Sequence, residues 1–122
     1  MKQVLLVFIG GGLGSALRFL ISKTLNPTFQ HFFLGTFIVN MVGCLLIGII
    51  LGFSAKSNLL PQNYTLLLAT GFCGGFTTFS TFAFEKHSLL KSGDFLQLAI
   101  YLITSIIIGV LAVMFGLWIT KQ

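Results

Sequence analysis

Charged side chains are scarce in this chain of 122 residues: Asp, Glu, Lys and Arg together make up 7% of it. Soluble domains carry about a quarter charged residues. With 56% hydrophobic residues and so few charges, most of the chain is expected to face lipid or itself. The basic residues stand apart from one another, so the net charge of +5 does not indicate a nucleic-acid partner.

Groups that carry out chemistry in enzymes are also scarce. Cys44 and Cys73 lie singly inside apolar stretches, and no CxxC spacing or Cys/His cluster indicates a metal site or a disulfide. No set of nucleophile, base and carboxylate suggests hydrolysis. The sequence therefore predicts a protein that is not an enzyme.

Long apolar runs dominate what is present. A transmembrane helix needs about 20 residues, and the chain offers four such segments, at about residues 4–21, 32–53, 62–90 and 95–119. The connections are short, so we expect a single transmembrane domain over residues 1–122. The first segment could also be a signal peptide, but Arg18 directly follows its small residues and three further spans come after it. Small residues four apart, such as Gly10 and Gly14 or Gly48 and Gly52, predict close helix packing.

Basic residues are nearly balanced between the two ends of these segments. Lys2, Lys56 and Lys121 fall at the end that holds both termini, and the opposite end holds Lys23, Lys86 and Lys91, with Arg18 nearby. Lys and Arg in short loops set the orientation of a membrane protein. The balance leaves two interpretations open: another feature sets the orientation, or the chain inserts both ways and forms an antiparallel homodimer.

The third segment contains the most unusual stretch, GFCGGFTTFSTF at residues 71–82. The segment is long for one straight span, and the pair Gly74-Gly75 disfavours helix. Irregular backbone at membrane depth occurs only where it is buried in protein or lines a wet cavity. The pair indicates either a glycine contact within a tilted helix or a broken helix whose freed carbonyls bind a cation.

Polar groups and aromatic rings alternate after the glycine pair. Phe79 and Phe82 share a helix face, and they either pack in the core or contact a passing ion. Hydroxyl side chains surround them at Thr77, Thr78, Ser80 and Thr81. Asn40 stands among apolar residues of the second segment, where its amide is expected either to bond a neighbouring helix or to line a pore.

No Asp, Glu, Lys or His occurs in the middle of the first, second or fourth segment, and we expect Glu85 and His87 to lie near the membrane interface. A proton-coupled transporter of the small multidrug-exporter type normally needs an embedded titratable group, so a secondary transporter is the weaker alternative. Hydroxyls, one amide and the positive edges of phenylalanine rings suit a weakly held anion. The pattern predicts a passive anion channel without choosing fluoride over chloride.

Three stretches, GGGLGSALRF (10–19), GTFIVNMVG (35–43) and GFCGGFTTFSTF (71–82), are similar to the signature stretches of the Fluc fluoride channels, the CrcB family. The resemblance covers all four spans. It implies an all-α membrane protein with four transmembrane helices, the third broken mid-membrane, assembled as an antiparallel dual-topology homodimer. The implied activity is passive export of fluoride across the cell (inner) membrane, which lowers fluoride toxicity in the cytoplasm.

The resemblance also implies roles for single residues. The implied anion pathway contains Asn40, Phe79, Phe82, Ser80, Thr81, Tyr101 and Ser105. Gly74 and Thr77 would bind a structural sodium ion through their backbone carbonyls at the dimer interface, and Arg18 and Glu85 would lie in a vestibule. The sequence does not decide whether a second, homologous subunit can replace the second copy.

Overall fold

The computed structural model describes residues 1–29, 32–56 and 60–121, and all regular elements in these ranges are helices. They are α1 (Lys2–Leu25), the short 3-10 helix η1 (Asn26–Thr28), α2 (Leu34–Ala55), α3 (Gln62–Thr65), the π-helical segment η2 (Leu66–Cys73), α4 (Gly74–Phe76), α5 (Ser80–Ser92) and α6 (Phe95–Lys121). Four stretches are long and apolar enough to cross a membrane: Lys2–Thr28, Leu34–Ala55, Gln62–Ser92 and Phe95–Lys121. The prediction of an all-α, multi-pass membrane protein with four spans is confirmed.

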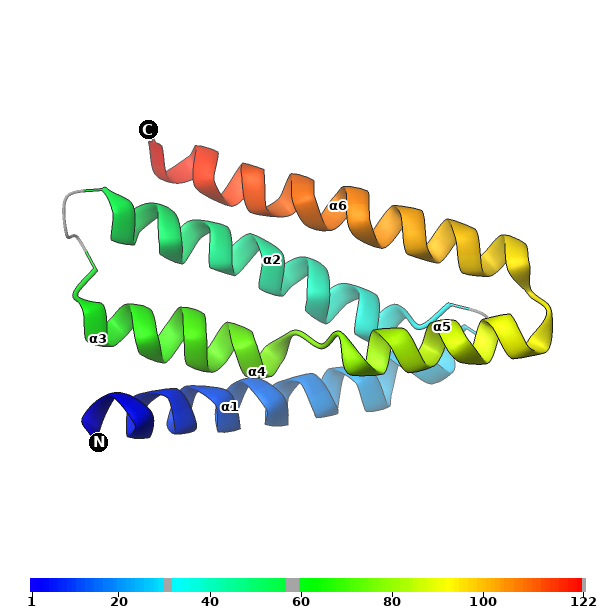
Figure 1. Ribbon diagram of the computed structural model, residues 1–122, viewed down its shortest axis with the longest axis horizontal. Coiled ribbons are helices and arrows are strands. Elements are labelled where there is room, and N and C mark those ends of the chain that lie inside the picture. The colour runs from blue at the N-terminus through cyan, green and yellow to red at the C-terminus, as the bar shows by residue number, and fades with distance from the viewer. Residues whose placement is uncertain (30–31, 57–59, 122) are drawn as a thin grey trace.

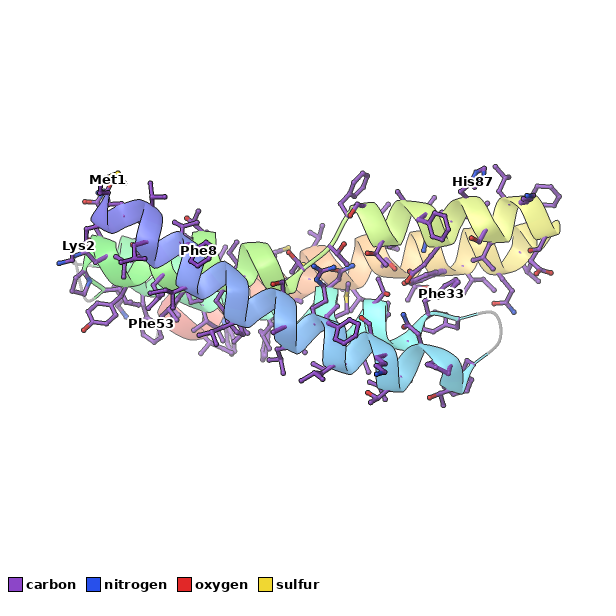
Figure 2. All side chains as sticks on the ribbon, turned by 90° about the horizontal axis from the view of Figure 1, so that it is seen from below. Met1, Lys2, Phe8, Phe33, Phe53 and His87 are labelled. Atoms are coloured by element: carbon purple, nitrogen blue, oxygen red, sulfur yellow. The ribbon has the colours of Figure 1, made fainter. Side chains whose placement is uncertain are left out.

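The spans lie along the long axis of the molecule, with both termini at one end (Figure 1). Met1 and Lys2 mark this end, and His87 lies towards the opposite one (Figure 2). Helix α1 packs on η2 and α4, and α2 packs on α6. Beyond α4, however, α5 packs on α6. The first part of the third span (η2 and α4) therefore packs against α1, and its last part (α5) packs against α6.

Local chemistry explains where several helices begin and end. Pro27 lies in the first turn of η1, and Pro61 caps the start of α3, positions where a missing N–H is tolerated. Helix α5 ends at Gly93, whose φ of 81° is the left-handed conformation that glycine adopts without strain. The side chain of Asn26 accepts a hydrogen bond from the Thr36 N–H at 3.1 Å, which ties the end of α1 to the start of α2.

Glycines make the closest helix contacts. A Cβ added at Gly10 or Gly14 would overlap carbonyl oxygens of η2, so α1 and η2 meet backbone to backbone. Gly48 of α2 and Gly116 of α6 are pressed in the same way against each other's helices. Because lipid gives apolar helices little hydrophobic reason to associate, such close approach is a main source of attraction between them.

Gly14→Ala is expected to destabilise the fold, because the new methyl group would overlap the carbonyl oxygen of Phe72. Overpacking of this kind costs about 1–3 kcal/mol. Gly12→Ala is the matched control, since nothing lies within 4 Å of a Cβ there and alanine favours helix. Thermal unfolding in detergent compares them, and equal midpoints for the two variants would contradict the contact.

Few side chains are fully buried in the single chain. The buried apolar residues are Val39, Ala69, Cys73, Phe76, Leu89 and Tyr101. Many large apolar side chains of α1 and α6, such as Phe8, Ile107 and Trp118, are exposed instead. Such surfaces are stable only against lipid or another protein, which agrees with the four membrane spans.

Candidate functional site

The third span is interrupted between α4 and α5. Thr77 has extended backbone, with φ −77° and ψ 158°, and helix resumes at Ser80. Gly74 and Gly75 themselves are helical, and Gly75 lies against the backbone of Gly11. Of the two interpretations of the glycine pair, the packing contact is confirmed for Gly75. The third span is also interrupted, but the irregular backbone follows α4 and does not lie at the glycines.

Side-chain hydrogen bonds replace helical ones at this break. In a continuous α-helix the Thr78 N–H would donate to the Gly74 carbonyl, and the Thr81 N–H to the Thr77 carbonyl. Instead, Thr78 N–H donates to Asn40 Oδ1 at 2.8 Å, and Thr81 N–H donates to Thr78 Oγ1 at 3.2 Å. The carbonyls of Gly74 and Thr77 are thus released from their helical donors and can accept another partner.

Asn40 fixes the break from a neighbouring helix. Besides accepting the Thr78 N–H, it donates from Nδ2 to the Thr78 carbonyl at 3.2 Å. The sequence left inter-helix bonding and pore lining open for this amide. The structure shows the inter-helix bonds and also places Asn40 at the wall of a cavity.

This cavity has a volume of about 600 Å³ and lies beside the break. Phe79, at its wall, is 79% exposed in the single chain. The Ser105 hydroxyl is buried and has no hydrogen-bond partner among the described residues. The predicted site residues that line the cavity are Asn40, Gly74, Thr77, Phe79, Phe82 and Ser105.

A buried polar network lies next to Phe82. The Phe82 and Tyr101 rings meet edge to face, with centroids 5.6 Å apart and an interplanar angle of 72°. Glu85 is only 3% exposed, and its carboxylate accepts hydrogen bonds from the Tyr101 hydroxyl, at 3.1 Å, and from Thr36 Oγ1. The expected interfacial position of Glu85 is therefore wrong, because two hydroxyls from other helices hold the carboxylate inside the bundle. Sequence reasoning missed Thr36, whose only signal was a hydroxyl near the start of an apolar segment.

Three other predicted site residues lie near the break but not at the cavity wall. Arg18 donates from Nε to the carbonyl oxygen of Gly75 at 3.1 Å, so it caps a carbonyl of α4. The Ser80 hydroxyl lies 3.5 Å from the Thr78 hydroxyl. Thr81 contributes its N–H to the bond that ends the break.

Fold and site together define a small multi-pass membrane protein with an interrupted helix beside a mainly apolar cavity, whose wall also holds hydroxyls, an amide and two aromatic rings. Over residues 5–117 the chain matches the family described as "CrcB-like protein, Camphor Resistance (CrcB)". The chain belongs to the CrcB family.

Curated relatives match nearly the whole chain. A protein of Azobacteroides pseudotrichonymphae is 44% identical over 99% of this chain and 98% of its own length. One from Phocaeicola vulgatus is 43% identical over 99% of this chain and all of its own length, and one from Gloeothece citriformis is 44% identical over all of this chain and 99% of its own length. Each is named "Fluoride-specific ion channel FluC".

Proposed function

We propose that this protein is a channel that conducts fluoride passively and exports it across the cell (inner) membrane. The observation that carries the proposal is full-length similarity to proteins named as fluoride-specific ion channels. The cavity beside the break supports it, because the amide of Asn40, the hydroxyl of Ser105 and the rings of Phe79 and Phe82 suit a small anion. None of the described residues at the cavity wall carries a formal charge that would hold an anion too tightly to leave.

Fluoride efflux from proteoliposomes tests this function. With valinomycin carrying potassium as the counter-ion, a fluoride electrode should record rapid efflux without an imposed proton gradient, and chloride-loaded vesicles should release far less. Glu85 is a buried titratable group, so the secondary-transporter alternative is tested in the same assay. Efflux that occurs only with a proton gradient would favour the transporter, and no fluoride efflux at all would contradict both proposals.

The functional unit is an antiparallel homodimer, formed by two copies inserted in opposite orientations. The exposed Phe79 ring and the mainly apolar cavity beside it support a second copy as the missing wall. The charge count supports opposite insertion. Lys86 has a buried ammonium, so three basic residues at one end (Lys2, Lys56 and Lys121) face two at the other (Lys23 and Lys91), or three when Arg18 is included.

Adding lysines at one end should remove the dual orientation. In the parent, a reporter fused to the C-terminus is expected to be found on both sides of the membrane. The pair Gln3→Lys and Gln62→Lys charges the terminal end and should bias the reporter to one side, because Lys and Arg are retained in the cytoplasm. The pair Gln3→Lys and His87→Lys adds the same charge to both ends and should leave both orientations. A parent that reads one side only would refute dual topology.

A sodium ion bound by the Gly74 and Thr77 carbonyls of both copies holds the centre of the dimer. The released carbonyls support this site, since unwound backbone oxygens are ligands that sodium uses in membrane proteins. Both residues line the cavity where the second copy would pack. Among the described residues no group of three or more His, Cys, Asp and Glu side chains could hold a metal. The bound ion would supply a fixed positive charge between the copies.

A further inference from the structure

Lys86 places a buried ammonium group beside the cavity. Its Nζ lies over two aromatic rings, 3.8 Å from the centroid of Phe82 and 3.0 Å from that of Tyr101. The nitrogen is inaccessible to solvent and has no hydrogen-bond partner among the residues that the structure describes. The expectation that Lys86 is an orienting charge at the membrane surface is therefore wrong, because α5 directs its side chain into the bundle.

The carboxylate of the adjacent Glu85 acts on the Lys86 ammonium through space, but the two form no hydrogen-bonded ion pair among the described residues. The oxygens of the adjacent Glu85 are taken by the hydroxyls of Thr36 and Tyr101. Ring faces attract a cation, but they do not replace the water and the anion that an exposed lysine would have. A mobile anion in the neighbouring cavity would also be attracted by this charge, without binding to the ammonium directly.

Phe82 connects the ammonium to the cavity. The ring lines the cavity wall while one of its faces lies under Nζ. A phenyl ring has a negative face and a positive edge. A cation over the face draws π-electron density towards itself, so the edge becomes more positive. The charge of Lys86 therefore strengthens the attraction of an anion to the ring edge.

We propose that Lys86 is a positioning residue for the permeating anion, acting through the ring of Phe82 to favour a small, hard anion such as fluoride at the ring edge. This inference rests on the proposed channel function and adds a residue to it that lies outside the signature stretches at residues 10–19, 35–43 and 71–82. It also gives a reason for a buried lysine that packing alone does not provide.

The test compares neutral and charged replacements in proteoliposomes, with efflux measured over a range of fluoride concentrations. Lys86→Met and Lys86→Gln remove the charge and should raise the half-saturating fluoride concentration about tenfold, while maximal efflux changes little. Lys86→Arg keeps a cation that stacks on aromatic rings and should stay within about threefold of the parent. Lys91→Met is the matched control, because Lys91 is exposed on the same helix. It should leave the half-saturating fluoride concentration unchanged when efflux is compared at equal amounts of antiparallel dimer. In a Phe82→Leu background, Lys86→Met should have little further effect.

A second readout does not depend on flux. Added fluoride should raise the thermal stability of the detergent-solubilised parent and of Lys86→Arg, but much less that of Lys86→Met or Lys86→Gln. If the parent carries no fluoride yet shows this charge-dependent stabilisation, the channel function fails and the anion site at Lys86 stands. Neutral variants that fold and keep the parent's concentration dependence in both assays would overturn the proposal. So would an arginine variant that is as impaired as the neutral ones, since shape and not charge would then explain the effect.

Discussion

Phe79→Ile and Phe82→Ile are each expected to reduce fluoride efflux about tenfold, and together about 100-fold. Isoleucine keeps much of the volume of phenylalanine but has no quadrupole, so the positive ring edge at the cavity wall is lost. Phe→Met should be milder at both positions, because a polarisable thioether partly replaces the ring. The measurement is initial fluoride efflux from proteoliposomes that contain equal amounts of dimer.

Burial separates an anion role from a packing role. Phe79 is 79% exposed in the single chain, so its replacement leaves the fold of that chain largely intact. Phe76, six positions before Phe82 and only 2% exposed, provides the control: Phe76→Ile should lower thermal stability more than Phe79→Ile does. Size exclusion checks assembly of every variant. If the Phe79 and Phe82 variants form normal dimers and conduct like the parent, the rings only fill space.

Asn40→Ala is expected to reduce fluoride efflux about 10- to 100-fold, because it removes both bonds that hold Thr78 in its irregular conformation. Without Asn40 Oδ1, the Thr78 N–H can donate to the Gly74 carbonyl as in a regular helix. The Gly74 and Thr77 carbonyl oxygens are then no longer both free to bind a sodium ion. The dimer of the parent should be more stable in sodium than in N-methylglucamine, and Asn40→Ala should lose that difference.

Thr77→Ser is the control for the break. Serine keeps the backbone carbonyl and can keep the hydroxyl bond to the Cys73 carbonyl, which is 2.9 Å long for Thr77. We expect this variant to conduct and to retain the sodium effect. A sodium effect that survives in Asn40→Ala would place the ion elsewhere, and a parent that is equally stable in both salts would contradict a structural sodium ion.

Several site residues could be found from sequence because their chemistry is unusual in a membrane span. Asn40 and the Phe79–Phe82 pair beside a row of hydroxyls stand out in apolar segments, and the structure brings them to one cavity. Ser105, at the same cavity, was expected only from the family resemblance. Thr36 and Lys86 could not be found in this way. Hydroxyls and lysines near span ends are ordinary, and only their partners distinguish them.

The position of the break also depended on a distant residue. The glycine pair is a local signal for weak helix, yet both glycines are helical. The irregular backbone begins at Thr77 and is held by Asn40, 38 positions before Thr78 in the chain. Local helix propensity reports only how strongly a residue itself favours helix. The hydrogen bonds that stabilise the irregular backbone at Thr78 come from Asn40 in another span.

By itself, the sequence determined that this is a four-span membrane protein with closely packed helices, because the length and apolarity of a span and the spacing of its glycines are local properties of the chain. The tertiary structure alone decided the burial of Glu85 and Lys86. Both lie near the end of a span, where the interface is the usual place for a charge. Glu85 stays inside because Thr36 and Tyr101 donate to its carboxylate, and Lys86 because the rings of Phe82 and Tyr101 receive its ammonium. The energy of a buried charge depends on the groups that surround it, and folding brings those groups together from three different spans.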